Sequence, residues 1–258
     1  MASDAKTAGN RAPTAPADPP CNSALGETII HGKGVVKVYD TGKIKVRALN
    51  GIDITVRKGE MVSIMGPSGC GKTTMLNCFS GIDDATSGTI FIEGKDLSKM
   101  SDNEKSRHRA KRMGFIFQNY NLLPVLTAVE NVELPLLVTG VKPKVAREKA
   151  EEMLRLVGLE KRTKFKPSEL SGGEQQRVTI ARSLVNDPAI VWADEPTGNL
   201  DAETSRQIMD LLTRLNRENG QTFVVVSHDN TVGERANRVI KMRDGRIERE
   251  YVPLKCEK

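Results

Sequence analysis

Short apolar runs alternate along the chain with segments whose apolar residues recur at helical spacing. Residues 61–65 (MVSIM), 189–194 (AIVWAD) and 222–228 (TFVVVSH) have the length and composition of buried strands. Residues 203–220, between the last two runs, have the spacing of a helix. This alternation of buried strands and helices predicts an α/β fold.

The pattern changes twice along the chain. Residues 27–93 alternate in strand fashion and predict an antiparallel flank beside the core, whereas residues 97–170 are mostly helical. Three helices are expected in that second region, at 102–112, 128–138 and 144–157. We therefore expect one domain over 27–258, with a helical insertion at about 97–170. Residues 1–26, rich in Ala and Pro, are expected to form a flexible tail without a function that the sequence shows.

The segment GPSGCGKT follows the apolar run 61–65 and precedes a helical segment. It fits G-x-x-x-x-G-K-[ST], the P-loop, whose backbone N–H groups surround nucleotide phosphates. Lys72 is expected to reach the outer two phosphates and Thr73 to offer its hydroxyl to Mg²⁺. A plain glycine turn is the alternative, which the strand–loop–helix context disfavours. The predicted phosphate-binding residues are Gly66, Pro67, Ser68, Gly69, Cys70, Gly71, Lys72, Thr73 and Thr74.

Two carboxylates, Asp194 and Glu195, end one of the apolar runs. Open α/β sheets bind ligands at such strand ends. We expect Asp194 to hold the Mg²⁺ shell and Glu195 to polarise the attacking water. Alone, the pair would fit a solvated strand end equally well, and the P-loop upstream favours the catalytic interpretation.

These motifs, with LSGGEQ at 170–175, resemble the ATP-binding cassette (ABC) ATPases from about residue 27 to about 252. The resemblance implies a P-loop NTPase (RecA-like) core with an antiparallel β subdomain and a helical insertion subdomain. It also implies ATP and Mg²⁺ as cofactors. Gln118 resembles the glutamine that senses the γ-phosphate and Mg²⁺, His228 the switch histidine, and Tyr39 the aromatic that stacks on adenine. Taken singly, Gln118 and His228 fit ordinary surface positions, and Tyr39 fits a core aromatic.

LSGGEQ has the form of a helix start, in which Ser171 caps a helix that begins at Gly172. Its glycines let a γ-phosphate approach bare N–H groups. In the resembled family this element, here Ser171, Gly172, Gly173 and Glu174, closes over ATP held by a second subunit. The chain has one P-loop and one LSGGEQ, so two composite sites require a head-to-tail pair with two-fold symmetry. Because every motif is intact, we expect a homodimer on ATP binding.

Two further segments resemble one branch of the family. RMGFIFQNYNLLPVLTAVENVELPLL and PTGNLD look like the lipoprotein-releasing and macrolide-exporting ATPases (LolD and MacB) and the cell-division ATPase (FtsE). The family's commoner interface loop has Ser and Ala where this chain has Asn199 and Leu200. The implied partner is a separate membrane permease with an extracytoplasmic domain. An alternative is a regulatory ATPase that transmits force to an envelope hydrolase without transport.

The apolar stretch after Gln118 is a candidate docking surface for that permease. A soluble monomer normally avoids clustered apolar side chains on its surface. We expect Leu122, Leu123 and Leu126 to border the groove that receives a cytoplasmic helix of the permease. The alternative for each leucine is the core of the helical insertion.

Composition narrows the partners further. The 258 residues carry a formal net charge of +6 that is spread along the chain without a nucleic-acid-binding motif, so no nucleic acid is expected. No apolar stretch approaches the roughly 20 residues that span a bilayer, so no direct membrane insertion is expected. We expect a cytoplasmic protein held at the inner face of the cell membrane by its permease.

The cysteines are scattered without C-x-x-C spacing, which predicts neither a zinc site nor a disulfide framework and favours a reducing cytosol. Cys70 is expected near Lys72 and a helix N-terminus, where a thiol becomes reactive. The alternative for Cys70 is an inert small residue.

Overall fold

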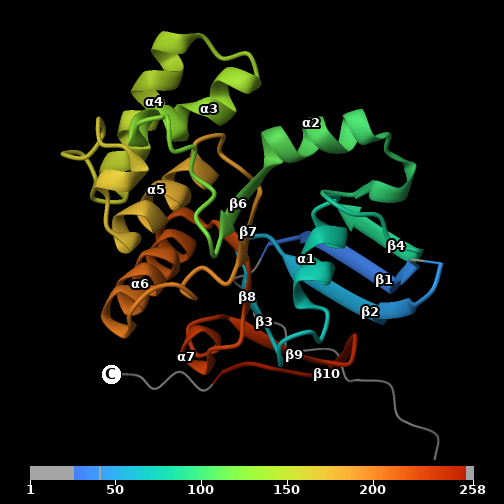
Figure 1. Cartoon of the computed structure of the whole chain (residues 1–258). Coiled ribbons are helices and arrows are strands. Elements are labelled where there is room, and N and C mark those ends of the chain that lie inside the picture. The colour runs from blue at the N-terminus through green and yellow to red at the C-terminus, as the bar shows by residue number, and fades with distance from the viewer. Residues whose placement is uncertain (1–25, 41, 254–258) are drawn as a thin grey trace, which may run out of the picture.

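The computed structural model describes residues 26–40 and 42–253, so residues 1–25 of the expected tail, Cys21 and Cys256 lie outside the described part. The described chain contains two sheets and a layer of helices (Figure 1). The N-terminal strands form one sheet, and the P-loop region with the C-terminal half forms the other.

The larger sheet is the core that the apolar runs predicted. Its strands, in spatial order, are β10 (Arg246–Tyr251), β9 (Arg238–Arg243), β3 (Met61–Met65), β8 (Thr222–Ser227), β7 (Ile190–Asp194) and β6 (Met113–Phe117). All neighbouring pairs are parallel except β10 with β9. Parallel strands carry their carboxyl ends to one edge of a sheet, which places the ends of β3, β6, β7 and β8 together.

The four inner strands β3, β6, β7 and β8 are mainly apolar because each contributes side chains to two hydrophobic clusters. Along β8, Phe223 and Val225 pack into the cluster with the helices between residues 128 and 219, whereas Val224 and Val226 pack into the cluster with the helix at 72–79 and the N-terminal strands. Successive side chains of a strand point to opposite faces. Burial on both faces therefore removes the polar alternation of a surface strand.

The smaller sheet is antiparallel. Its strands, in spatial order, are β2 (Lys45–Arg57), β1 (Thr28–Asp40), β4 (Ser87–Ile92) and β5 (Lys95–Asp96). Helix α1 (Lys72–Phe79) packs against it, and Phe79 lies so close to Gly32 that a Cβ there would be 2.4 Å from the ring. The sheet forms the flank expected for 27–93, with β3 and α1 belonging to the core.

The expected helical insertion is interrupted by a core strand. Helix α2 (Asp102–Arg112) is followed directly by β6, and only the residues after β6 form the helical layer seen in Figure 1. The helical layer consists of α3 (Ala128–Val138) and α4 (Pro143–Leu156). The remaining helices are α5 (Gly172–Leu184), α6 (Ala202–Asn219) and α7 (Asn230–Gly233), with the short 3₁₀ helices η1 (Leu97–Lys99) and η2 (Pro167–Glu169). The expected boundaries treated 97–170 as one mostly helical region, and the short apolar run before Gln118 forms the strand within it.

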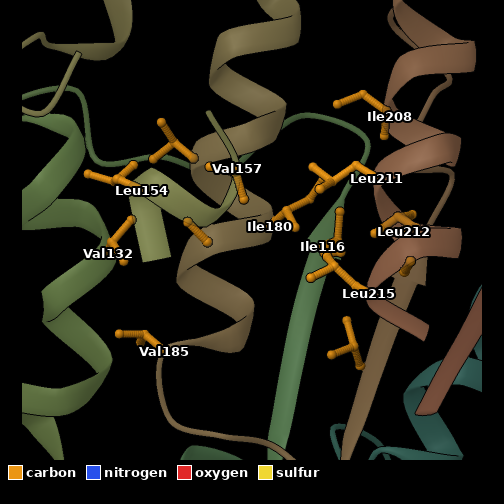
Figure 2. Packing of buried hydrophobic residues seen from close by; sticks show 14 of the residues in the cluster. Ile116, Val132, Leu154, Val157, Ile180, Val185, Ile208, Leu211, Leu212 and Leu215 are labelled. Atoms are coloured by element: carbon orange, nitrogen blue, oxygen red, sulfur yellow. The ribbon is translucent and has the colours of Figure 1, made fainter. Parts of the chain in front are cut away.

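Helix α5 packs between the helical layer and the core. Figure 2 shows Ile180 of α5 beside Ile116 of β6, with Val132 and Leu154 of the helical layer on one side and Leu211 of α6 on the other. All five side chains are buried. The position of α5, whose start carries LSGGEQ, is therefore fixed relative to both the helical layer and the larger sheet.

Candidate functional site

The P-loop connects β3 to α1 and has little room for side chains. A Cβ on Gly66 would lie 2.3 Å from the Met242 carbonyl oxygen, and one on Gly71, which has a φ of 102°, would lie 2.4 Å from the Ala48 carbonyl oxygen. Both distances are far below contact distance, so only glycine fits. The loop is thus shaped by the ends of its neighbouring strands before any ligand arrives.

The lysine of the P-loop folds back over it. The Lys72 ammonium donates to the carbonyl oxygens of Gly66 at 2.9 Å and Pro67 at 3.0 Å, and the residue is only 6% exposed. A buried ammonium and the N-terminus of α1 both favour an anion. Lys72 lines a cavity of about 420 Å³, together with residues that include Ser68, Gly69 and Thr73. The cavity fits the phosphates of a nucleotide.

Thr73 and Asp194 lie together at the edge of this cavity. The Thr73 hydroxyl lies 3.3 and 3.2 Å from the two carboxylate oxygens of Asp194, at the end of β7. Burial raises the pKa of the Asp194 carboxyl; the Thr73 hydrogen bond opposes this, and the nearby Glu195 adds to it. A cation would relieve this poorly solvated negative charge.

Oxygen ligands of this kind fit Mg²⁺, which uses one or two protein groups together with phosphates. Within the described ranges, no group of three or more His, Cys, Asp or Glu residues could hold a metal ion by itself. Thr73 and Asp194 are therefore the protein groups suited to a metal that enters with a nucleotide.

Glu195 and His228 form a pair beyond Asp194. His228 Nδ1 lies 2.9 Å from Glu195 Oε2, and the Glu195 N–H donates to the Val226 carbonyl oxygen at 2.9 Å. The φ of Glu195 is 48°, in the left-handed region that L-residues rarely adopt. The Glu195 side chain lines the P-loop cavity and also a second cavity of about 410 Å³ bordered by His228. Glu195 therefore faces the phosphate site from one side.

Gln118 follows β6 directly. Its neighbour Phe117 pairs with Asp194 across β6 and β7, which brings Gln118 to the edge of the sheet that carries Asp194. The Gln118 carboxamide donates to Asn199 Oδ1 at 3.1 Å. The structure thus joins Gln118 to Asn199 of the PTGNLD segment, two positions that the sequence analysis singled out separately.

Tyr39 is not a core aromatic. It is 39% exposed, and its hydroxyl donates to Asp83 Oδ2 at 2.9 Å. Burial and the Asp83 bond raise the pKa of the Tyr39 phenol, while a hydrogen bond with Thr74 opposes this. Thr74 lines the P-loop cavity, so the ring lies near its mouth. Lys37 Nζ lies 4.9 Å from the ring centroid.

The LSGGEQ segment begins α5 as the sequence predicted. The Ser171 hydroxyl accepts from the Glu174 N–H at 3.3 Å, and the Ser171 N–H donates to the Glu174 carboxylate at 2.9 Å. These bonds form a capping box. Glu174 also accepts from Arg162 at 2.9 Å. Its carboxylate therefore shapes the start of the helix within its own chain.

The two glycines of LSGGEQ have neighbours that the sequence did not reveal. A Cβ on Gly172 would lie 2.9 Å from the Tyr120 hydroxyl, and one on Gly173 would lie 2.6 Å from Thr204 Cγ2. Among the described residues that line the P-loop cavity, none belongs to 170–175. The helix start therefore does not line the P-loop cavity of its own chain.

The arrangement of these segments agrees with a family comparison. A family model of ABC transporters matches residues 49–198, which include the P-loop, LSGGEQ and both carboxylates. The chain belongs to the ABC transporter family. As a member it is an ATP-hydrolysing cassette with the P-loop NTPase fold.

Individual relatives support this membership. An ABC transporter ATP-binding protein of Thermotoga maritima is 49% identical over 214 residues, which are 83% of this chain and 91% of that protein. The ATP-binding cassette MJ0796, solved as a dimer in a post-hydrolysis state with ADP and Pi, is 43% identical with a TM-score of 0.80. That match covers 87% of this chain and 98% of MJ0796.

A more distant solved structure has the same fold. CbiO1 of Clostridium perfringens, part of the ABC transporter complex CbiONQ, is 28% identical with a TM-score of 0.79. The match covers 88% of this cassette and 89% of CbiO1.

Cys70 is buried beneath the loop. Its side chain is 5% exposed and packs in the core cluster, which favours the alternative of an inert position, and its reactivity stays a prediction. A Cβ on Gly66 would lie 2.7 Å from its sulfur. Burial raises the pKa of the Cys78 thiol to about 11.

None of the helices in the described part of the chain has the length and apolar composition needed to span a membrane.

Proposed function

We propose that this cassette is the nucleotide-binding subunit of a transporter of the lipoprotein-release or macrolide-export type. It dimerises on ATP and drives a separate membrane permease that carries an extracytoplasmic domain. The observation that carries the dimer in this proposal is that two motifs lie apart in one chain, which we treat as two half-sites. The P-loop and Glu195 line one cavity, with Asp194 beside Thr73 at its edge, and the capped start of α5 does not line it. Two copies related by a two-fold axis complete both sites.

The residues of the site support in-line attack of water on the γ-phosphorus. Glu195 would accept a proton from the water. His228 Nδ1, 2.9 Å from Glu195 Oε2, would hold the Glu195 carboxylate in place. Lys72 would exchange its bonds to Gly66 and Pro67 for the phosphate oxygens, which neutralises charge as the bond to the β-phosphate oxygen breaks. Mg²⁺, when bound with ATP, supplies further positive charge next to the outer phosphates.

We assign the remaining residues of the site to nucleotide recognition. Thr73, Asp194 and Gln118 would hold the Mg²⁺, and the exposed ring of Tyr39 would stack on adenine. The N–H groups of residues 172 and 173 of the second copy would meet the γ-phosphate, with Ser171 beside them. The chain would then lie at the inner face of the membrane through its permease.

The permease would dock beside β6. A groove of about 420 Å³ lies there, and its lining includes Phe115, Phe117 and Pro135. Of the three leucines expected at this surface, Leu123 is 44% exposed, whereas Leu122 packs partly against the helical core. Leu126 is half-buried. We therefore assign the groove to a cytoplasmic helix of the permease, and we expect Leu123, two residues after the lining residue Asn121, to border it.

The decisive experiment uses Glu195→Gln, which keeps the shape of the side chain and removes its charge. Hydrolysis should fall by a factor of about 10² to 10⁴, while Mg-ATP still binds. The ATP-bound dimer should then accumulate in size-exclusion chromatography with light scattering. A variant that stays monomeric at saturating Mg-ATP would contradict the composite-site proposal.

A second experiment separates the two half-sites. Ser171→Arg should leave ATP binding by the isolated chain nearly intact and abolish turnover, because it blocks closure over the partner's nucleotide. Mixing it with excess Lys72→Ala protein should restore some activity, since each mixed dimer contains one intact site. Formation of mixed dimers without any activity would mean either that both sites must work together or that LSGGEQ does not act on the opposite subunit.

The type of permease encoded by a neighbouring gene would distinguish transport from the regulatory alternative, and co-purification of that permease with this chain tests the docking surface. We expect Leu123→Asp to reduce co-purification and to leave basal ATP hydrolysis by the isolated chain unchanged. Val252, which is 53% exposed and follows β10 at the opposite edge of the larger sheet from β6, provides the matched control as Val252→Asp. Equal loss of binding with both variants would place the docking surface elsewhere.

A further inference from the structure

Two carboxamides from distant segments face each other at the edge of the nucleotide site. Gln118 Nε2 donates to Asn199 Oδ1 at 3.1 Å. Asn199 Nδ2 donates in return to the backbone carbonyl oxygen of Gln118 and to Asn119 Oδ1, each at 3.0 Å. Gly198 makes room for this contact, because a Cβ there would lie 2.8 Å from Gln118 Nε2.

The chemistry of these groups fixes the orientation of both carboxamides. A backbone carbonyl can only accept a hydrogen bond, so Asn199 must turn its NH₂ group toward the carbonyl of Gln118. Its oxygen then faces the Gln118 side chain and can itself only accept. Gln118 must therefore present its NH₂ group to Asn199, which directs Gln118 Oε1 to the opposite side.

The backbone after Gln118 is held independently of this contact. Tyr120 and Asn121 have φ values of 58° and 50°, in the left-handed region. Arg182 of α5 donates to the carbonyl oxygens of both residues, at 2.9 Å and 2.6 Å. Removing the side chain of Asn199 would thus release the Gln118 carboxamide while Arg182 still holds the turn.

We propose that Asn199 is a positioning residue that selects which end of the Gln118 carboxamide meets the metal. The inference rests on the role proposed above for Gln118. Mg²⁺ binds a carbonyl oxygen and is repelled by an NH₂ group. The terminal torsion of glutamine has two nearly equivalent wells, so an unanchored Gln118 would present the wrong end part of the time. Asn199 removes that choice.

The measurement is the effect of Mg²⁺ on nucleotide affinity. A fluorescent N-methylanthraniloyl-ATP would be titrated with excess Mg²⁺ and again with EDTA, at protein concentrations below those of dimerisation. Asn199→Ala should leave affinity in EDTA unchanged and reduce the gain from Mg²⁺ about two- to tenfold, the range expected for one lost hydrogen bond. Asn199 is exposed, so the urea midpoint should stay the same.

Two further variants make the test specific. Asn119→Ala, the matched control, removes one bond of Asn199 and leaves its contact with Gln118, so it should keep the full Mg²⁺ effect. Gln118→Ala should lose at least as much of that effect as Asn199→Ala, while Thr73 and Asp194 still hold the metal. The double variant Gln118→Ala/Asn199→Ala should match Gln118→Ala alone.

The outcomes separate this inference from the role on which it rests. If Gln118→Ala keeps the full Mg²⁺ effect, the role proposed for Gln118 is wrong. If Gln118→Ala loses the effect but Asn199→Ala keeps it, the positioning role of Asn199 is overturned. An equal loss of affinity with and without Mg²⁺ in Asn199→Ala would also overturn it, because a general structural role would act on both.

Discussion

Replacing Gly173 by alanine should destabilise the contact between α5 and α6. The new Cβ would lie 2.6 Å from Thr204 Cγ2, whereas ordinary contact begins at 3.4 Å. Thr204 cannot turn away freely, because its hydroxyl donates to Asp201 Oδ2 at 2.6 Å within the N-cap of α6. Overpacking costs about 1–3 kcal/mol. Replacing glycine by alanine in a helix returns up to about 1 kcal/mol. We expect a net loss of about 1 kcal/mol.

The rescue variant is Thr204→Ser. Serine keeps the hydroxyl for Asp201 and lacks the methyl group that meets the new Cβ. In urea unfolding, Gly173→Ala/Thr204→Ser should therefore be about 1 kcal/mol more stable than the two single variants predict by addition. Additivity of the single variants within about 0.3 kcal/mol would refute the steric argument.

The same pair of variants separates packing from phosphate binding at Gly173. If glycine is needed only beside Thr204, the double variant should regain ATP hydrolysis together with stability. If the partner's γ-phosphate must also approach the bare N–H group, stability should return while hydrolysis stays low. We expect the second result.

Three further predictions concern single side chains. Lys72→Ala should weaken ATP binding itself, measured by equilibrium dialysis, and an unchanged affinity would exclude Lys72 from phosphate binding. Alkylation at Cys70 should be slow and limited by opening of the loop, because the thiol is buried, so ATP should protect it; equal inhibition of wild type and Cys70→Ala would exclude this cysteine. Glu174→Gln should lose stability relative to wild type above pH 4.5, and this difference should shrink as pH falls, measured by urea midpoints.

The sign of the last effect follows from the bonds of Glu174. The Ser171 N–H bond and, to a lesser degree, Arg162 hold the pKa of the Glu174 carboxyl below its usual range. A lowered folded-state pKa contributes stability that is present above the unfolded value and lost as pH falls through the folded value. Because the Glu174 side chain is partly exposed and solvent screens its charge, the effect should be a few tenths of a kcal/mol. A difference that grows on acidification would contradict this assignment.

Short-range sequence patterns were enough to predict the buried strands and the starts of several helices. The buried strands were visible because both of their faces are covered, as for β7 and β8. The start of α5 was visible because Ser171 and Glu174 have the spacing of a capping box. Helices α2 and α3 lie where they were expected, and each also begins with a capping box.

Contacts between distant segments were not predictable in the same way. Strand β6 is recognised only by its pairing with β7, and the burial of Cys70 only by what covers it. The sequence marked Gln118 and Asn199 separately, but nothing local shows that residues 81 positions apart share hydrogen bonds. Long-range packing decides such contacts, and a single sequence carries no direct signal of it.

The division of the inner strands β3, β6, β7 and β8 between two clusters bears on how this sequence can change over evolutionary time. Val224, Ile64 and Trp192 border one small void, whereas Val225, next to Val224 in the chain, belongs to the other cluster. A volume change at Val224 is therefore compensated by mutation at Ile64 or Trp192, and Val225 has no part in it. Substitutions should accumulate as two separate sets, each restricted to one side of the sheet.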